Sequence, residues 1–126
     1  MSQIRSLDDL PGRRFPAGRL TRVLGGPGAP DMPEGFVLGV SALDPWGAVP
    51  PHEHDNEELY LALEGSGTIE IDGEQHPFAA GQYVYLCPGV RHGTTAGPAG
   101  MRLLFAYAPA GEVSHWSEEL RPEVSR

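Results

Sequence analysis

The chain has almost no cysteine and no lysine: among its 126 residues, Cys87 is the single thiol and all 9 basic residues are arginine. One thiol cannot form a disulfide within the chain, so the fold must rest on an apolar core. A chain of this length fits one domain and buries roughly two-thirds of its unfolded surface. No apolar run approaches the roughly 18 residues of a membrane span, and the N-terminus lacks a secretion signal. We therefore expect a cytoplasmic protein without a membrane partner.

Positive charge is also scarce, because 17 acidic residues give a formal net charge of −8. An acidic surface repels the phosphates of nucleic acids, so we expect no nucleic-acid partner. Five of the arginines lie within the first 22 residues. We interpret this local basic stretch as a solvated arm, because charge runs are usually exposed to water.

Helix-favouring stretches are few, whereas 17 glycines and 13 prolines are spread along the chain with short apolar runs between them. This punctuation predicts an all-β antiparallel sandwich or barrel. The expected strands are residues 36–43, 58–63, 68–71, 74–78, 82–86 and 101–107. Asp72-Gly73 predicts a two-residue hairpin turn, and the glycines of Gly65-Ser66-Gly67 predict a break between two strands.

The organisation that we predict has three parts. Residues 1–35 form an N-terminal arm, residues 36–110 form the barrel, and residues 111–126 form a tail. Short helical turns are expected near both termini. In the tail, Val113, Trp116 and Leu120 recur at the spacing of one helix face.

The chemistry is concentrated in one histidine-rich stretch. His52 and His54 are two residues apart, so on a strand both imidazoles face the same side. Glu58 reaches that side if the chain turns back after His54, and its parity places Tyr60 there too. His92 lies far along the sequence, but closing a barrel brings distant strands together. These residues alone also fit an acidic surface turn.

Three imidazoles and one carboxylate form a nitrogen and oxygen ligand set. Such a set suits a divalent transition metal, namely Fe, Mn, Ni, Cu or Zn, and suits calcium poorly. Four protein ligands leave one or two positions open on a five- or six-coordinate ion. An open position beside an apolar pocket is what metal catalysis requires.

Two glycine-punctuated motifs around these residues resemble those of the cupin superfamily. The first motif is represented by Gly47, His52, His54, Glu58 and Gly65, and the second by Gly81, Cys87, Gly89 and His92. Fifteen residues separate the motifs, as in compact single-barrel members, and the resemblance covers residues 36 to 107. The departures are a Gly47 that lies one residue too close to His52, a Cys87 in place of proline and an Ala96 in place of asparagine.

The resemblance implies a small single-domain cupin: a jelly-roll β-barrel with the metal inside one open end. It also implies a homodimer, with an N-terminal strand from residues 12–24 laid across the partner. Of the two adjacent glutamates, Glu58 keeps the motif spacing to Gly65, whereas Glu57 would face the opposite side of the strand.

Three functions fit this site. The first, which we favour from the sequence, is a non-haem metal-dependent dioxygenase acting on a small organic molecule. The second is a redox-neutral isomerase, cyclase or lyase, in which the metal is a Lewis acid and Tyr60 or Glu58 moves protons. The third is a cupin that binds a small ligand without catalysis. Tyr60 can equally be a buried aromatic whose hydroxyl is satisfied within the core.

Several other residues carry weaker signals. We interpret Cys87 as a small core residue rather than a nucleophile at the pocket rim. Arg91 and Arg102 can clamp a carboxylate, but solvated arginines are the simpler interpretation. His76 and His115 lie outside both motifs and are expected at the surface or an interface. The strand 101–107 must turn one parity inward, and the sequence leaves open which one.

Overall fold

The structure is a computed structural model that describes residues 3–111 and 113–120. Its elements, in chain order, are the 3-10 helix η1 (Leu7–Asp9), the strands β1 (Gly12–Phe15), β2 (Arg19–Gly25), β3 (Val37–Leu43), β4 (Ala48–His52), β5 (Glu57–Ile71), β6 (Glu74–Ala79), β7 (Tyr83–Leu86) and β8 (His92–Ala108), and the helix α1 (Ser114–Leu120). The all-β prediction is confirmed.

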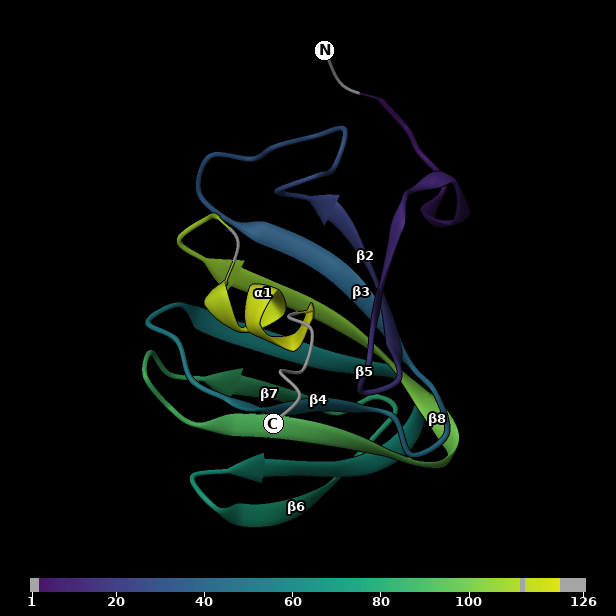
Figure 1. Cartoon of the computed structure of the whole chain (residues 1–126), viewed down its shortest axis with the longest axis vertical. Helices are drawn as coiled ribbons and strands as arrows, with labels where there is room; N and C mark the ends of the chain where they lie inside the picture. The colour runs from purple at the N-terminus through teal and green to yellow at the C-terminus, as the bar shows by residue number, and fades with distance from the viewer. Residues whose placement is uncertain (1–2, 112, 121–126) are drawn as a thin grey trace, which may run out of the picture.

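The strands form one antiparallel sheet in the order β1-β2-β3-β8-β5-β6, with β4 also paired to β8 and β7 to β5. The long strands β5 and β8 pair with each other from Glu57 opposite Ala108 to Ile71 opposite His92. Each of them serves both layers: the first half of β8 pairs with β4 and the second half with β3. The sheet therefore rolls into a jelly-roll barrel with an open end (Figure 1).

Along the two long strands, every second side chain points inward, and these side chains fill the barrel. Tyr60 and Ala62 of β5 are buried, and their neighbours in sequence face outward. In β8 the buried residues are Met101, Leu103, Phe105 and Tyr107, which settles the parity that the sequence left open. Burying side chains of this size is the main favourable contribution to folding. The same inward row carries Glu58 at the open end of the barrel.

The expected break at Gly65-Ser66-Gly67 is wrong, because β5 runs through it as one strand. The pairing register with β8 shifts between Ala62 and Glu64 and again between Gly65 and Gly67. Gly65 has a φ of +77°, and a Cβ there would lie 2.2 Å from the carbonyl oxygen of Gly100. Glycine therefore permits a bulge that bends the strand from one layer into the other. Asp72 and Gly73 both have positive φ, as the predicted hairpin turn requires.

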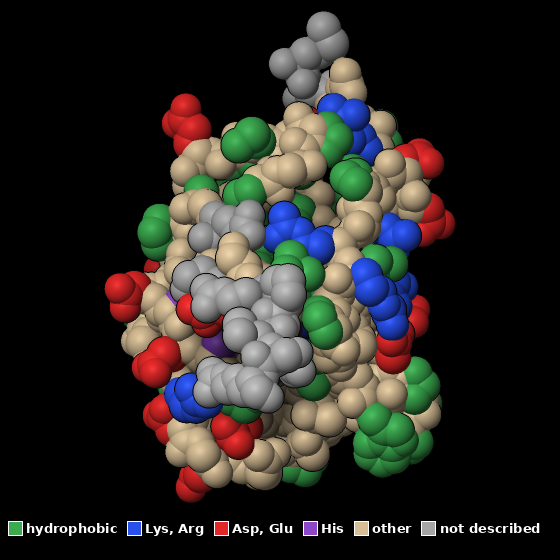
Figure 2. Space-filling view, viewed as in Figure 1, with side chains coloured by type: hydrophobic (Ala, Val, Ile, Leu, Met, Phe, Trp, Pro, Cys, Tyr) green, Lys and Arg blue, Asp and Glu red, His purple; other side chains and the backbone are tan. Residues whose placement is uncertain are grey.

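Residues of the expected N-terminal arm add strands to the barrel sheet. β1 pairs with β2, and β2 pairs with β3 of the same chain. Figure 2 shows most of the arginine side chains on this face over the N-terminal strands, with acidic side chains near them. Contact of residues 12–24 with a partner stays a prediction. Within the described residues, no helix is long and apolar enough to cross a membrane.

The C-terminal helix α1 packs over the open end of the barrel (Figure 1). Its Trp116 is buried and lies edge-on to the rings of Phe105 and Tyr107, and 6.3 Å from the ring of Phe15. Aromatic contacts of this kind each contribute about 0.5–1.5 kcal/mol beyond the area that they bury. Side-chain packing therefore holds α1 at the open end of the barrel, beside the candidate metal ligands. Residues 112 and 121–126 of the expected tail lie outside the described residues.

Candidate metal centre

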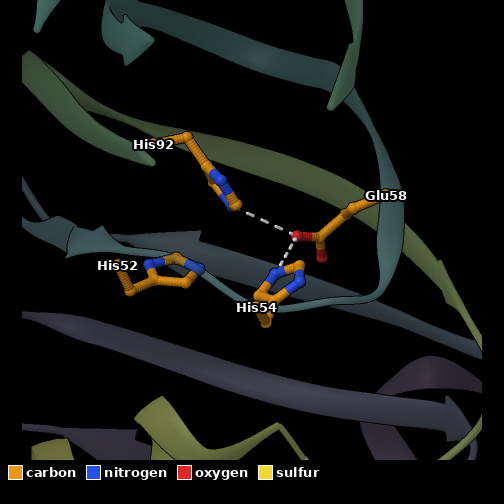
Figure 3. A group of neighbouring side chains, drawn as sticks. All are labelled: His52, His54, Glu58 and His92. Atoms are coloured by element: carbon orange, nitrogen blue, oxygen red, sulfur yellow. Dashed lines mark hydrogen bonds and ion pairs between the residues drawn. The ribbon is translucent and has the colours of Figure 1, made fainter. Parts of the chain in front are cut away.

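The four predicted ligands converge at the open end of the barrel (Figure 3). His52 ends β4, and His92 begins β8 directly opposite it in the ladder. His54 lies in the loop that follows β4, and Glu58 lies on β5. One nitrogen or oxygen from each of the four side chains lies within 4.8 Å of the others. The structure therefore brings together the complete predicted set from three separate stretches of backbone.

Each imidazole is oriented by the main chain. The Nδ1 atom of His52 lies 2.7 Å from the carbonyl oxygen of Pro50, and that of His92 lies 2.9 Å from the carbonyl of Val90. The Nδ1 atom of His54 lies 3.0 Å from the carbonyl of Asn56. Because a carbonyl only accepts, Nδ1 carries the proton in each ring and Nε2 presents a lone pair. Outer hydrogen bonds of this kind fix the tautomer and orientation of metal-ligating histidines.

The inner nitrogen atoms fit a cation. The Nε2 atoms of His52 and His92 are buried and lack a hydrogen-bond partner among the described residues. The Nε2 atoms of His54 and His92 lie 3.2 and 3.4 Å from Oε1 of Glu58. A buried lone pair without a donor is costly, whereas a divalent ion would satisfy all four ligands together. The donor set and the two unpartnered nitrogens therefore fit a transition metal.

Electrostatics hold two of the four candidate ligands, His52 and Glu58, in the forms that bind a metal. Burial, together with the neighbouring His115 and His92, lowers the pKa of His52 to about 3. Burial alone would raise the pKa of Glu58, but the imidazoles of His54 and His92 beside its carboxylate outweigh burial and lower that pKa. His52 is therefore neutral and Glu58 is ionised near pH 7. Metal ligands must be in these deprotonated forms.

Tyr60 lies beside the ligands, as its strand parity predicts. Its ring is edge-on to that of His92, with the centroids 5.9 Å apart. Burial raises the pKa of the Tyr60 hydroxyl well above 10, and the negative charge of Glu58 raises it further. The phenol therefore stays protonated at neutral pH. Its position allows it to donate to a molecule bound next to Glu58.

The interpretation of His115 as a surface residue is wrong. This residue of α1 is buried, and its ring stacks on that of His52 with centroids 3.6 Å apart. Its Nδ1 atom lies 3.1 Å from Oε2 of Glu119, one helical turn later. Glu119 in turn pairs with Arg19, which is buried although we expected a solvated arm. Sequence reasoning missed these three residues, and the His–Glu spacing of one helical turn was the available signal.

The other weak candidates lie away from the centre. Cys87 is exposed, so its interpretation as a core residue is wrong: the Pro-Gly turn that follows it holds the chain at the surface. Arg91 is exposed, and Arg102 forms a surface ion pair with Glu64 at 3.2 Å. His76 is exposed, 3.6 Å from Glu74, as expected.

A small cavity lies between Glu58 and part of α1. It is lined by Arg19, Ser41, Val49, Glu58, Tyr60, Leu103, Phe105, Val113, His115 and Trp116. Its volume of about 20 Å³ has room for about one water molecule. The barrel end is thus an apolar chamber with a few polar groups at one side, as in small-molecule sites, but α1 fills most of it.

Comparison with known proteins agrees with this geometry. The model of the cupin domain family matches residues 39–107. A dimethylsulfoniopropionate lyase, DddW of Ruegeria pomeroyi, is 41% identical over 83 residues, which are 66% of this chain and 55% of the relative. The chain thus spans about half the length of that curated relative.

Two solved structures have the same fold. The polyketide cyclase RemF of Streptomyces resistomycificus is 27% identical, with a TM-score of 0.75 over 86% of this chain and 80% of that one. An RmlC-like cupin of Shewanella frigidimarina is 19% identical, with a TM-score of 0.76 over 89% of this chain and 95% of that one. The second likeness is one of fold alone.

Proposed function

This chain belongs to the cupin family, and on that premise we propose that it is a metal-dependent enzyme of redox-neutral chemistry, a lyase or cyclase acting on a small organic molecule. The observation that carries the proposal is a complete ligand set whose Glu58 lines a small cavity together with Tyr60. The 41% identity with a lyase, and the 27% identity with a cyclase, support this class over an oxidative one.

A divalent metal held at this site, one of Fe, Mn, Ni, Cu or Zn, would supply Lewis acidity. The three imidazoles and Glu58 would hold it, with their orientation set by the main chain. Tyr60 donates or holds a proton at the substrate, because its hydroxyl stays protonated and the residue lines the same cavity as Glu58. The apolar lining, including Leu103 and Phe105, excludes bulk water from the reaction.

The oxygen requirement tests the class of reaction. We would offer dimethylsulfoniopropionate, the substrate named for the relative, to protein loaded separately with each of the five metals. Elimination releases a proton from one carbon to water and breaks the C–S bond of the adjacent carbon, with the electron pair going to sulfur, so dimethyl sulfide, acrylate and a proton appear in equal amounts. We expect the same turnover in air and under nitrogen. Turnover of any substrate that needs oxygen and stops under nitrogen would favour the dioxygenase, and saturable binding without product would favour a binding protein.

Replacing Tyr60 with phenylalanine tests its role as proton carrier. We expect kcat to fall by about 10²-fold, the usual contribution of a positioned acid or base, while the metal content stays unchanged. Tyr83→Phe is the matched control, because Tyr83 is 74% exposed. The activity of this variant should equal that of the parent protein. Full activity of Tyr60→Phe would leave Tyr60 as a core aromatic.

We also propose a homodimer through the outer face of β5 and β7, which has large exposed apolar side chains. These are Leu59, Leu63, Tyr83 and Tyr85, with Phe36 beside them. Apolar faces of this kind mark association sites. Leu59→Glu should convert the dimer to a monomer in sedimentation equilibrium, whereas Met32→Glu, on the loop between β2 and β3, should leave the mass unchanged. A parent protein that sediments as a monomer would contradict the proposal.

The cytoplasmic location stays a prediction.

A further inference from the structure

Arg19 is a buried cation at the open end of the barrel. Its side chain is 1% exposed, and its guanidinium carbon lies 3.9 Å from the centroid of the Phe15 ring. One of its nitrogens also donates to the carbonyl oxygen of Ala48 at 3.2 Å. A guanidinium removed from water needs an anion, because the penalty for an unpaired buried charge is severe. The fold has therefore built an anion site at this position.

In this structure, the anion is the side chain of Glu119. The two terminal guanidinium nitrogens of Arg19, Nη1 and Nη2, donate to the two carboxylate oxygens of Glu119, at 2.5 and 2.7 Å. The partners are 100 residues apart in sequence, and Glu119 reaches Arg19 from α1. Two parallel hydrogen bonds from one guanidinium form the fork that recognises any carboxylate, whether it belongs to the protein or to a ligand.

The Arg19 site opens into the same cavity as the candidate metal centre. Arg19, Glu58 and Tyr60 all line it, together with His115. The cavity of about 20 Å³ is too small for an organic molecule while α1 is in place. Side chains of α1 fill the rest: His115 stacks on His52, and Trp116 packs among aromatic rings. A substrate therefore requires α1 to move, and that movement removes Glu119 from Arg19.

We propose that Arg19 binds the carboxylate of a small organic acid, and that Glu119 occupies this site in its place while α1 closes the barrel. A ligand carboxylate on Arg19 would replace Glu119 charge for charge, and would direct the rest of the molecule toward Glu58 and Tyr60. The proposal adds a substrate class, small organic acids, to the proposed function. It depends on the proposed function only for the reaction that the bound acid undergoes. Binding at Arg19 is independent of turnover.

Trp116 reports the position of α1. The chain has two tryptophans, so Trp46→Phe leaves Trp116 as the single emitter. Trp116 is 5% exposed, and its emission should move to longer wavelength when α1 leaves the barrel. We would titrate the metal-loaded protein with propionate and, in parallel, with propionamide, its neutral isostere. We expect a saturable shift with propionate and none with propionamide.

Variants of the ion pair assign the site. In Glu119→Gln the competing carboxylate is gone, so propionate should bind about tenfold or more tightly by calorimetry. Arg19→Gln should reduce binding by at least tenfold. Arg19→Lys keeps the charge without the fork, and it should also weaken binding if the glutamine variant fails to fold. Glu118→Gln, at the exposed neighbouring position, should behave as the parent.

Four results would overturn the proposal: equal effects of propionate and propionamide, parental affinity in both Arg19 variants, no tightening in Glu119→Gln, or no binding by the parent at all. Unchanged binding in the Arg19 variants would assign the carboxylate to the metal itself. The outcome is separable from that of the proposed reaction. A protein that binds propionate through Arg19 but has no activity would support this site and refute the proposed reaction. An active protein whose KM is unchanged in Arg19→Lys would support the reaction and refute this site.

Discussion

Replacing His92 with alanine is expected to lower the metal content of the purified protein at least tenfold while the barrel remains folded. His92 supplies one of four ligand atoms, and its Nε2 has no other partner among the described residues. Loss of an outer partner of a ligand already costs 10–100-fold in metal affinity, so loss of the ligand itself should cost at least as much. Elemental analysis of protein purified without added metal measures the effect, and circular dichroism checks the fold.

The matched control for this experiment is His76→Ala. His76 is exposed on β6 and lies away from the ligand set, so the metal content should equal that of the parent. His52→Ala should repeat the loss seen for His92, because the two residues face each other across the ladder. A His92 variant that retains its full metal content would refute the ligand assignment and, with it, the proposed chemistry.

Replacing Gly65 with alanine is expected to destabilise the fold by about 3 kcal/mol or more. A φ of +77° strains any L side chain by about 1–2 kcal/mol. The added Cβ would also lie 2.2 Å from the carbonyl oxygen of Gly100, a backbone atom that cannot rotate away. Overpacking of this kind costs about 1–3 kcal/mol. The sum is a large part of the 5–15 kcal/mol of a typical domain, and urea unfolding measures it.

Gly73→Ala separates the two contributions. Gly73 has a φ of +85°, close to that of Gly65, but a Cβ there meets nothing within 4 Å. Its substitution should therefore cost only the strain of about 1–2 kcal/mol. If the two variants unfold at the same urea concentration, the close approach to Gly100 contributes nothing, and the bulge in β5 needs another explanation.

The grouping of the four candidate ligands could be predicted because most of their signals are local. Two histidines two residues apart share a strand face, and Glu58 follows at the parity of Tyr60, so the four positions depended on strand periodicity and on the motif spacing. The long strands were harder. Glycine both ends strands and permits bulges, so Gly65-Ser66-Gly67 looks the same in either case. Only the pairing with the neighbouring strand β8, where Gly65 lies against Gly100, shows that β5 continues.

The cluster of Arg19, His115 and Glu119 was missed because its contacts join the two ends of the chain. Charge runs are usually solvated, and this prior placed Arg19 in water. Its alternation with Thr21, which is also buried, was the signal that one of the arginines faces inward. For Cys87 the error has a different cause. Cysteine is often buried, but a statistical preference does not outweigh the Pro-Gly turn beside it.

The carbonyl groups of Pro50, Asn56 and Val90 have a consequence for how this barrel can change. They accept from the three imidazoles, and they belong to the main chain. No exchange of a neighbouring side chain can delete an acceptor that every residue possesses. Mutation can therefore reshape the cavity wall formed by Val49, Leu103 and Phe105, and with it the substrate specificity. The orientation of the three Nε2 lone pairs would stay the same. Specificity can diverge in such a scaffold without the reactive centre being rebuilt.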